Sequence, residues 1–172
     1  MYKRQHFAAG VGWRATKKFP AYQRDLTKSS RDPVNRNLVA NRRRTTLQPV
    51  DPSDGATWWW VTRLGRLDAV QFNLIDKTSK DVLASCEVFG LDLYIPKWGH
   101  RAAGIGEIWV ADEHQGHDYD LSLLLDMSRY LKEQLVNILD VAVDQANEQL
   151  VQLFETAGFE RWDTGVVYES AD

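Results

Sequence analysis

The feature of the sequence that most constrains its fold is a helix pattern between two strand patterns in the second half of the chain. Apolar residues within 121–135 recur at the spacing of one face of an amphipathic helix. The strand-like stretch "EIWV" at 107–110 comes before it, and the nearly continuous apolar, β-branched stretch "VNILDVAV" at 136–143 follows. A helix that joins two neighbouring strands of one sheet carries the chain back to the starting end of the sheet, so these strands are predicted to run parallel.

Further strand and helix patterns surround this unit. The stretches "AVQFNLID" at 69–76 and "VLASCEVFGLDL" at 82–93, separated by a polar turn, predict an antiparallel hairpin. The range 94–106, which contains a proline and three glycines, predicts a loop. Apolar residues at 150, 153, 154 and 157 predict a second helix that ends at Gly158, and "GVVYE" at 165–169 predicts a last strand. The predicted fold class is α/β or α+β, with a mixed central β-sheet flanked by helices.

The first 55 residues differ in composition from the rest of the chain. Residues 1–50 carry a net charge of +10, whereas residues 51–172 carry −13. Four prolines and little periodicity within 1–55 predict a basic, irregular N-terminal arm with one short helix within 17–27, next to a folded domain at 56–172. Such an arm can bind nucleic acid, an acidic partner protein or the acidic body of its own chain. No motif of a nucleic-acid-binding domain accompanies its basic residues.

The composition favours a cytoplasmic protein. The chain of 172 residues has no apolar run of the roughly 20 residues that span a bilayer, so no membrane interaction is expected. Its single cysteine, Cys86, cannot form an intrachain disulfide and lies in a strand pattern, which favours a buried thiol. His114 and His117 lie close together in a loop without a third ligand, so no metal site is predicted.

Two spaced motifs follow one another in the second half of the chain. In "VADEHQGHDYDLSLLL" at 110–125, a strand ending at Val110 is followed by Gln115 and Gly116 and then by an apolar helix. In "NEQLVQLFETAGFE" at 147–160, Asn147 is followed at fixed spacing by a leucine and by a Gly-Phe pair. In this order the two motifs resemble those of the GNAT superfamily of acetyl-coenzyme-A-dependent N-acyltransferases, and the resemblance covers roughly residues 69–169.

The resemblance implies a GNAT-like sheet and a loop that wraps the pyrophosphate of coenzyme A. In the family this loop uses backbone N–H groups and the positive end of a helix dipole. Acetyl-CoA is therefore the implied cofactor if the protein is active, and none is implied otherwise. The residues that the resemblance places at this cofactor site are Val110, Gln115, Gly116, His117, Asp118, Tyr119, Asp120 and Asn147.

Two of these residues depart from the family pattern, because Asp118 and Asp120 stand where the family has glycines. A carboxylate about 5 Å from a phosphate charge costs roughly 3 kcal/mol at an effective dielectric constant near 20. Aspartate tolerates the left-handed backbone conformation of such a loop better than most residues, so the backbone shape can survive. We expect the two carboxylates to cap the helix that starts near Leu121 and so to fill the anion site from within.

The resemblance also implies a base on or near the strand before the loop and a tyrosine on the second helix that protonates the leaving thiolate. Glu107 is the first candidate for the base and Glu87 the second, with a solvent-facing carboxylate as the alternative for each. Phe154 occupies the tyrosine position and has no proton to donate, and its periodicity indicates a core residue. Tyr119 or Tyr130 can substitute in principle, but nothing in the sequence favours either.

These observations lead to three hypotheses about function. The first is a GNAT-like protein with a degenerate acetyl-CoA site that binds or inhibits another protein, as small virus-encoded, host-directed effectors do. The alternative is an active but divergent acetyl-CoA-dependent N-acyltransferase, and the third is a nucleic-acid-associated protein that binds through the basic arm. For the first hypothesis the candidate partner-binding residues are Trp58, Trp59, Trp60, Arg42, Arg43 and Arg44.

Overall fold

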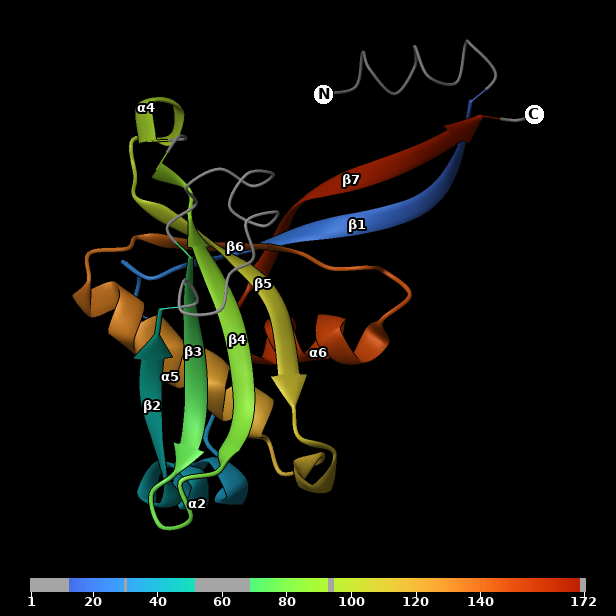
Figure 1. The fold of residues 1–172 in the computed structure, drawn as a ribbon. Coiled ribbons are helices and arrows are strands. Elements are labelled where there is room, and N and C mark those ends of the chain that lie inside the picture. Colours follow the sequence, from blue (N-terminus) through green and yellow to red (C-terminus); the bar gives the residue numbers. More distant parts are fainter. Residues whose placement is uncertain (1–12, 30, 52–68, 93–94, 171–172) are drawn as a thin grey trace.

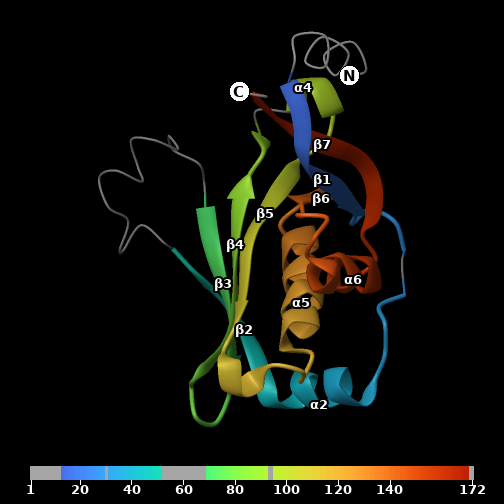
Figure 2. The same cartoon turned by 90° about the vertical axis from the view of Figure 1, so that its right-hand side faces the viewer.

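The computed structural model describes residues 13–29, 31–51, 69–92 and 95–170, which form a mixed sheet with helices packed on one side (Figures 1 and 2). The sheet has seven strands in the order β2-β3-β4-β5-β6-β1-β7. The elements are β1 (Trp13–Asp25), α2 (Arg36–Arg44), β2 (Thr45–Val50), β3 (Ala69–Asp76), β4 (Val82–Gly90), α4 (Ile95–Trp98), β5 (Ala102–Val110), a 3-10 turn (Asp112–His114), α5 (Tyr119–Glu133), β6 (Ile138–Ala142), α6 (Glu148–Thr156) and β7 (Glu160–Ser170).

The expected crossover is confirmed. β5 and β6 pair in parallel, and α5 connects them. The hairpin of β3 and β4 is antiparallel as expected, and Gly158 after α6 adopts the left-handed conformation with a φ of 84°. The loop expected at 94–106 was wrong in its second half, because β5 begins at Ala102. Its first residues are small and buried, so they form a strand without the alternation that identifies an exposed one.

The expectation of an irregular arm and of a helix within 17–27 is corrected by the structure. That range lies in β1, which occupies a place inside the sheet between β6 and β7, and α2 and β2 follow it. Pro20, Tyr22 and Arg24 alternate inward with more exposed residues, but the charge of Arg24 conceals the pattern. Arg24 is 7% exposed, and an ion pair of 2.8 Å with Asp32 compensates its charge.

The core lies between the sheet and α5. Leu74 of β3, Leu123 and Leu124 of α5 and Leu139 of β6 are completely buried in one cluster. The packing explains why α5 carries apolar residues on more than a narrow stripe, since it contacts β3, β4 and β5 as well as α2 and α6. Cys86 of β4 belongs to the same cluster, and burial raises the pKa of its thiol to about 12.

Trp58, Trp59 and Trp60 lie outside the described residues. Among the described helices, none combines the length and the apolar character of a membrane-spanning helix.

Candidate functional site

The site is organised by the divergence of two parallel strands. β5 and β6 pair only through Ala102 with Ile138, Ala103 with Leu139 and Gly104 with Asp140. Beyond the pair of Gly104 and Asp140, β5 continues toward Val110 beside β4 alone. Figure 1 shows β5 turning away from β6 toward the N-terminal end of α5. The divergence therefore exposes backbone of β5 that a regular parallel sheet would cover.

A bulge lies on β5 just after this point. Cys86 and Val88 of β4 face Ile108 and Ile105 of β5, so a step of two residues on β4 opposes a step of three on β5. The extra residue falls at Gly106 and Glu107. Ile105 and Ile108 pack into the core, so the two bulge residues lie on the outer face of the sheet, which is the face opposite α5.

The two candidate bases come together at this bulge. A Cβ atom placed on Gly106 would lie 3.3 Å from Cβ of Glu87 and 3.4 Å from its Oε2, so the side chain of Glu87 covers the bulge. Glu107 is exposed and Glu87 is half-buried. The sequence indicated each glutamate separately, and the bulge explains why both reach the same part of the outer face.

Asp140 is a further candidate residue, which the sequence analysis did not single out. It lies on β6 at the point of divergence, and its Oδ2 accepts hydrogen bonds from Nε2 of Gln23 (2.8 Å) and Nε1 of Trp162 (3.1 Å). Burial raises the pKa of the Asp140 carboxyl, and these two hydrogen bonds counteract the increase. The available signal was one aspartate inside a nearly continuous apolar strand, but its partners come from β1 and β7, which are distant in sequence.

The loop before α5 has the backbone shape that the aspartates were expected to permit. Gly116 and Asp118 have φ angles of 78° and 56°, both in the left-handed region. The expected capping by Asp118 was wrong, because its side chain makes no capping hydrogen bond. Its Oδ2 instead accepts hydrogen bonds from the side-chain amides of Asn35 (3.1 Å) and Asn37 (3.0 Å) beside and in the first turn of α2.

Asp120 comes closer to the expected capping of α5. Its Oδ1 accepts a hydrogen bond of 2.7 Å from the N–H of Leu121 in the first turn of α5. Burial raises the pKa of the Asp120 carboxyl, this hydrogen bond lowers it, and the neighbouring Asp118 raises it. One of the two carboxylates therefore engages the helix terminus, and the other turns away from it.

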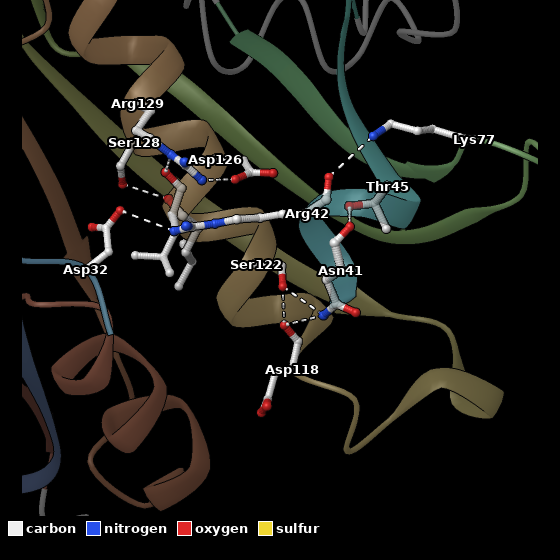
Figure 3. A network of polar contacts seen from close by, with 12 residues as sticks. Asp32, Asn41, Arg42, Thr45, Lys77, Asp118, Ser122, Asp126, Ser128 and Arg129 are labelled. Atoms are coloured by element: carbon white, nitrogen blue, oxygen red, sulfur yellow. Dashed lines mark hydrogen bonds and ion pairs between the residues drawn. The ribbon is translucent and has the colours of Figure 1, made fainter. Parts of the chain in front are cut away.

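A side chain of α2 forms hydrogen bonds with both this loop and α5 (Figure 3). Nδ2 of Asn41 donates to the carbonyl oxygen of His117 (3.0 Å) and to Oγ of Ser122 (2.9 Å). Oγ of Ser122 donates in turn to the carbonyl oxygen of Asp118 (2.7 Å). Asn41 is 5% exposed, so this junction is a buried polar contact between two helices.

The three candidate partner-binding arginines, at 42–44, lie in the last turn of α2. Arg44 forms an ion pair with the buried Asp76, and Arg42 lies 3.9 Å from a carboxylate oxygen of Asp32. Arg43 is exposed. The structure thus brings these arginines next to the loop of the candidate cofactor site, which the sequence alone did not indicate.

The remaining candidates occupy separate positions. Phe154 is 2% exposed and packs edge to face on Phe159, which confirms that it is a core residue. Asn147 caps α6 by accepting a hydrogen bond of 3.1 Å from the N–H of Leu150. Val110 is half-buried at the end of β5, and Gln115 binds Asp112 through its side chain.

The two tyrosines that could replace a tyrosine at position 154 are packed against other rings. The ring of Tyr119 lies 5.6 Å from that of His114 and 6.1 Å from that of His117. Tyr130 packs edge to face on Phe72. Within the described ranges, no group of three or more His, Cys, Asp or Glu side chains is arranged to hold a metal ion.

Comparison with curated proteins finds two partial relatives, and no family model matches the chain. Mycothiol acetyltransferase of Paenarthrobacter aurescens is 36% identical over 76 residues, which are 42% of this chain and 23% of that protein. Mycothiol acetyltransferase of Stackebrandtia nassauensis is 37% identical over 73 residues, which are 41% of this chain and 24% of that protein. The matching segment thus spans about a quarter of the curated relatives.

Comparison with solved structures covers nearly the whole chain. A tandem GNAT protein from the clavulanic acid biosynthesis pathway matches 98% of this chain and 58% of its own, with a TM-score of 0.67 and 16% identity. The match with a GCN5-related glucosamine N-acetyltransferase region of a fungal multi-domain protein covers 97% of this chain and 22% of that chain, with a TM-score of 0.66 and 19% identity. The match with a GCN5-related N-acetyltransferase from Sphaerobacter thermophilus covers 98% of this chain and 56% of that chain, with a TM-score of 0.62 and 13% identity.

Proposed function

We propose that this chain, which has the fold of the GNAT N-acetyltransferases, is a divergent acetyl-CoA-dependent N-acyltransferase. The observation that carries the proposal is the combination of diverging β5 and β6 with a left-handed loop that leads directly into α5. The partial identity with two mycothiol acetyltransferases supports the same activity class. The acyl acceptor is not carried over from these relatives, because the matching segment spans so little of them.

The loop before α5 fits a diphosphate better than its sequence suggested. Within the described residues, the N–H groups of Gly116, Asp118 and Tyr119 have no hydrogen-bond acceptor. Asn35 and Asn37 hold the carboxylate of Asp118 on the side of α2, so its charge is not directed at these amides. The amides and the helix dipole are thus available to bind an anion.

Bound acetyl-CoA supplies the thioester, which is the activated acetyl group. Either Glu107 or Glu87 accepts a proton from the acceptor ammonium, because only a neutral amine is a nucleophile. The neutral amine nitrogen would then bond to the acetyl carbon as the carbon–sulfur bond breaks, and the sulfur would leave with the electron pair as a thiolate. The proton that the nitrogen loses on becoming an amide would pass through solvent to this thiolate. Phe154 cannot donate a proton to that sulfur, so we assign no general acid among the aromatic residues of α6.

The protein-binding hypothesis depended on an anion site filled by two carboxylates. Only Asp120 engages the helix terminus, so that argument loses one of its two charges. Arg42 and Arg44 face carboxylates of this chain, which reduces their availability to nucleic-acid phosphates. No observation among the described residues favours an inhibitory or host-directed role.

The first test compares the melting temperature of the protein with and without acetyl-CoA. A ligand that binds only the native state stabilises it by about 2.7 kcal/mol at a hundredfold excess over its dissociation constant, so we expect a clear increase in melting temperature. Asp120→Asn removes the remaining charge at the helix terminus and is expected to increase the shift. No shift with either protein would exclude acetyl-CoA binding.

The second test assigns the base. Glu107→Gln and Glu87→Gln are assayed for acetyl transfer to a panel of primary amines, with Glu133→Gln at the exposed end of α5 as the matched control. Loss of a general base lowers kcat by roughly a hundredfold to ten-thousandfold. We expect that loss in one of the two variants and full activity in the control. Equal activity in all three would remove both glutamates from the mechanism.

A further inference from the structure

We propose that Asp140, held by Gln23 and Trp162, binds a second ionised amino group of the acyl acceptor, so that the acceptor is a diamine. One amino group reacts beside Glu87 and Glu107, and the other stays protonated on Asp140. This inference rests on the proposed function, since it names the class of acceptor for that reaction.

The position of Asp140 follows from the register of the sheet. Its neighbours Leu139 and Val141 are buried toward the helices, so its side chain lies on the outer face. The bulge with Glu107 and the side chain of Glu87 lie on the same face. Gly104 of β5 is the partner of Asp140 in the sheet, and Glu107 is three residues further along β5. The α-carbons of Gly104 and Glu107 are therefore about 10 Å apart along the strand.

An aromatic surface lies between the two carboxylate positions. Gly104 pairs with Phe89 on one side and with Asp140 on the other. A Cβ atom on Gly104 would lie 2.3 Å from the ring of Phe89, so this ring occupies the space above the glycine. Carboxylate, ring and carboxylate thus follow one another across β4, β5 and β6. An apolar carbon chain with an amino group at each end has the matching order.

The environment of Asp140 favours a cationic ligand. Its hydrogen-bond donors, Gln23 and Trp162, are both neutral and both bind Oδ2. No ion pair among the described residues involves Asp140, although its side chain is half-buried. A partly buried carboxylate without a cation is costly, and a ligand ammonium supplies that cation. Trp162 is 50% exposed, and the N–H at the edge of its ring is directed at Asp140.

Reaction leaves this second amino group unchanged. The nitrogen beside Glu87 and Glu107 would give one proton to a glutamate before it forms the bond with the acetyl carbon. As the carbon–sulfur bond breaks, the second proton of that nitrogen would pass through solvent to the departing thiolate. The ammonium on Asp140 keeps its proton throughout, so it orients the substrate and takes no part in bond making. Asp140 is therefore a positioning residue, and its replacement is expected to change KM more than kcat.

The test measures binding without any acetyl donor. Isothermal titration compares 1,5-diaminopentane with pentylamine on the wild-type protein, Asp140→Asn, Trp162→Phe and the control Asp81→Asn, which changes an exposed turn. We expect the wild type and the control to bind the diamine at least tenfold more tightly than the monoamine. Asp140→Asn is expected to abolish that difference, and Trp162→Phe to reduce it, because it removes one donor but keeps the ring.

Folding of the variants is checked separately. Burial raises the pKa of Asp140, so its charge costs stability at neutral pH and Asp140→Asn is expected to melt no lower than the wild type. Equal affinity of the wild type for the diamine and the monoamine would overturn the inference. An unchanged preference in a well-folded Asp140→Asn protein would do the same.

Acetyl-transfer kinetics separate this inference from the proposed function. If the diamine binds in a manner that depends on Asp140 but no amine is acetylated, the role of Asp140 in diamine binding stands and the proposed acyltransferase activity is refuted. Equal KM values for the diamine and the monoamine, with transfer to both, would preserve the enzyme and refute the role of Asp140. A KM for the diamine that increases at least tenfold in Asp140→Asn with little change in kcat supports both.

Discussion

At the scale of single residues, Asp76 shows how the start of β2 is held. Its side chain is 2% exposed, forms an ion pair with Arg44 and accepts hydrogen bonds from the N–H groups of Thr78 (2.7 Å) and Ser79 (3.1 Å). The hydrogen bond from Arg44 and then those two N–H groups lower the pKa of the carboxyl to about 2. Because the folded pKa lies below the unfolded one, this stabilisation is complete above about pH 4 and is lost as the pH falls toward 2. We therefore expect Asp76→Asn to melt several degrees below the wild type at pH 7, with the difference shrinking toward pH 2. Melting curves across pH, with Asp81→Asn as the exposed control, check this, and a difference independent of pH would contradict it.

At the scale of elements, the junction of α2 with α5 depends on Asn41. Replacement by alanine removes the donor for the carbonyl oxygen of His117 and for Oγ of Ser122. Leaving buried polar groups unsatisfied costs about 1–3 kcal/mol, so urea unfolding of Asn41→Ala is expected to show a loss of that size. Arg43→Ala, an exposed residue on the same helix, is expected to change stability by less than about 0.5 kcal/mol. The loop at 115–118 should also lose its fixed backbone, so acetyl-CoA should stabilise Asn41→Ala less than it stabilises the control. Equal unfolding free energies of the two variants would show that the junction contributes little.

At the scale of the whole molecule, the place of β1 determines whether the N-terminal residues can be removed. β1 pairs with β6 through Ala21 to Asp25 and with β7 along nearly all of its length. Its deletion would leave β7 without a neighbour in the sheet and uncover the core beside β6. We expect a protein that starts at residue 51 to lack cooperative thermal unfolding, whereas deletion of residues 1–12, which leaves β1 intact, keeps it. Circular dichroism melts of both proteins test this, and cooperative melting of the shorter one would mean that residues 13–50 are dispensable.

The elements that the sequence predicted correctly are those with a local signal. The apolar spacing of α5, the continuous apolar stretch of β6 and the glycine after α6 each depend on residues close together in the chain. The parallel pairing of β5 and β6 followed from these elements because the crossover restricts how two such strands can pair. The fold class was therefore available from the second half of the sequence alone.

The parts that the sequence missed depend on distant partners. β1 looked irregular because an arginine fills one of its buried positions, and only the three-dimensional structure shows Asp32 and Ser128 beside that guanidinium. Asp118 carried an ordinary capping signal, but Asn35 and Asn37 compete for its carboxylate from another helix. Asp140 became a candidate site residue only through its hydrogen bonds with Gln23 and Trp162. Each of these three errors concerns a polar side chain whose partner the local pattern does not contain.

The insertion of β1 between β6 and β7 also has a consequence for synthesis of the protein. Gln23 of β1 and Asp140 of β6 are 117 residues apart. After the ribosome has synthesised β1, it therefore needs on the order of ten seconds to synthesise β6, its neighbour in the sheet. Throughout that interval the strand has unpaired edges on both sides, the condition under which nascent chains associate with chaperones or with one another. Closure of this half of the sheet thus awaits translation of the last strand.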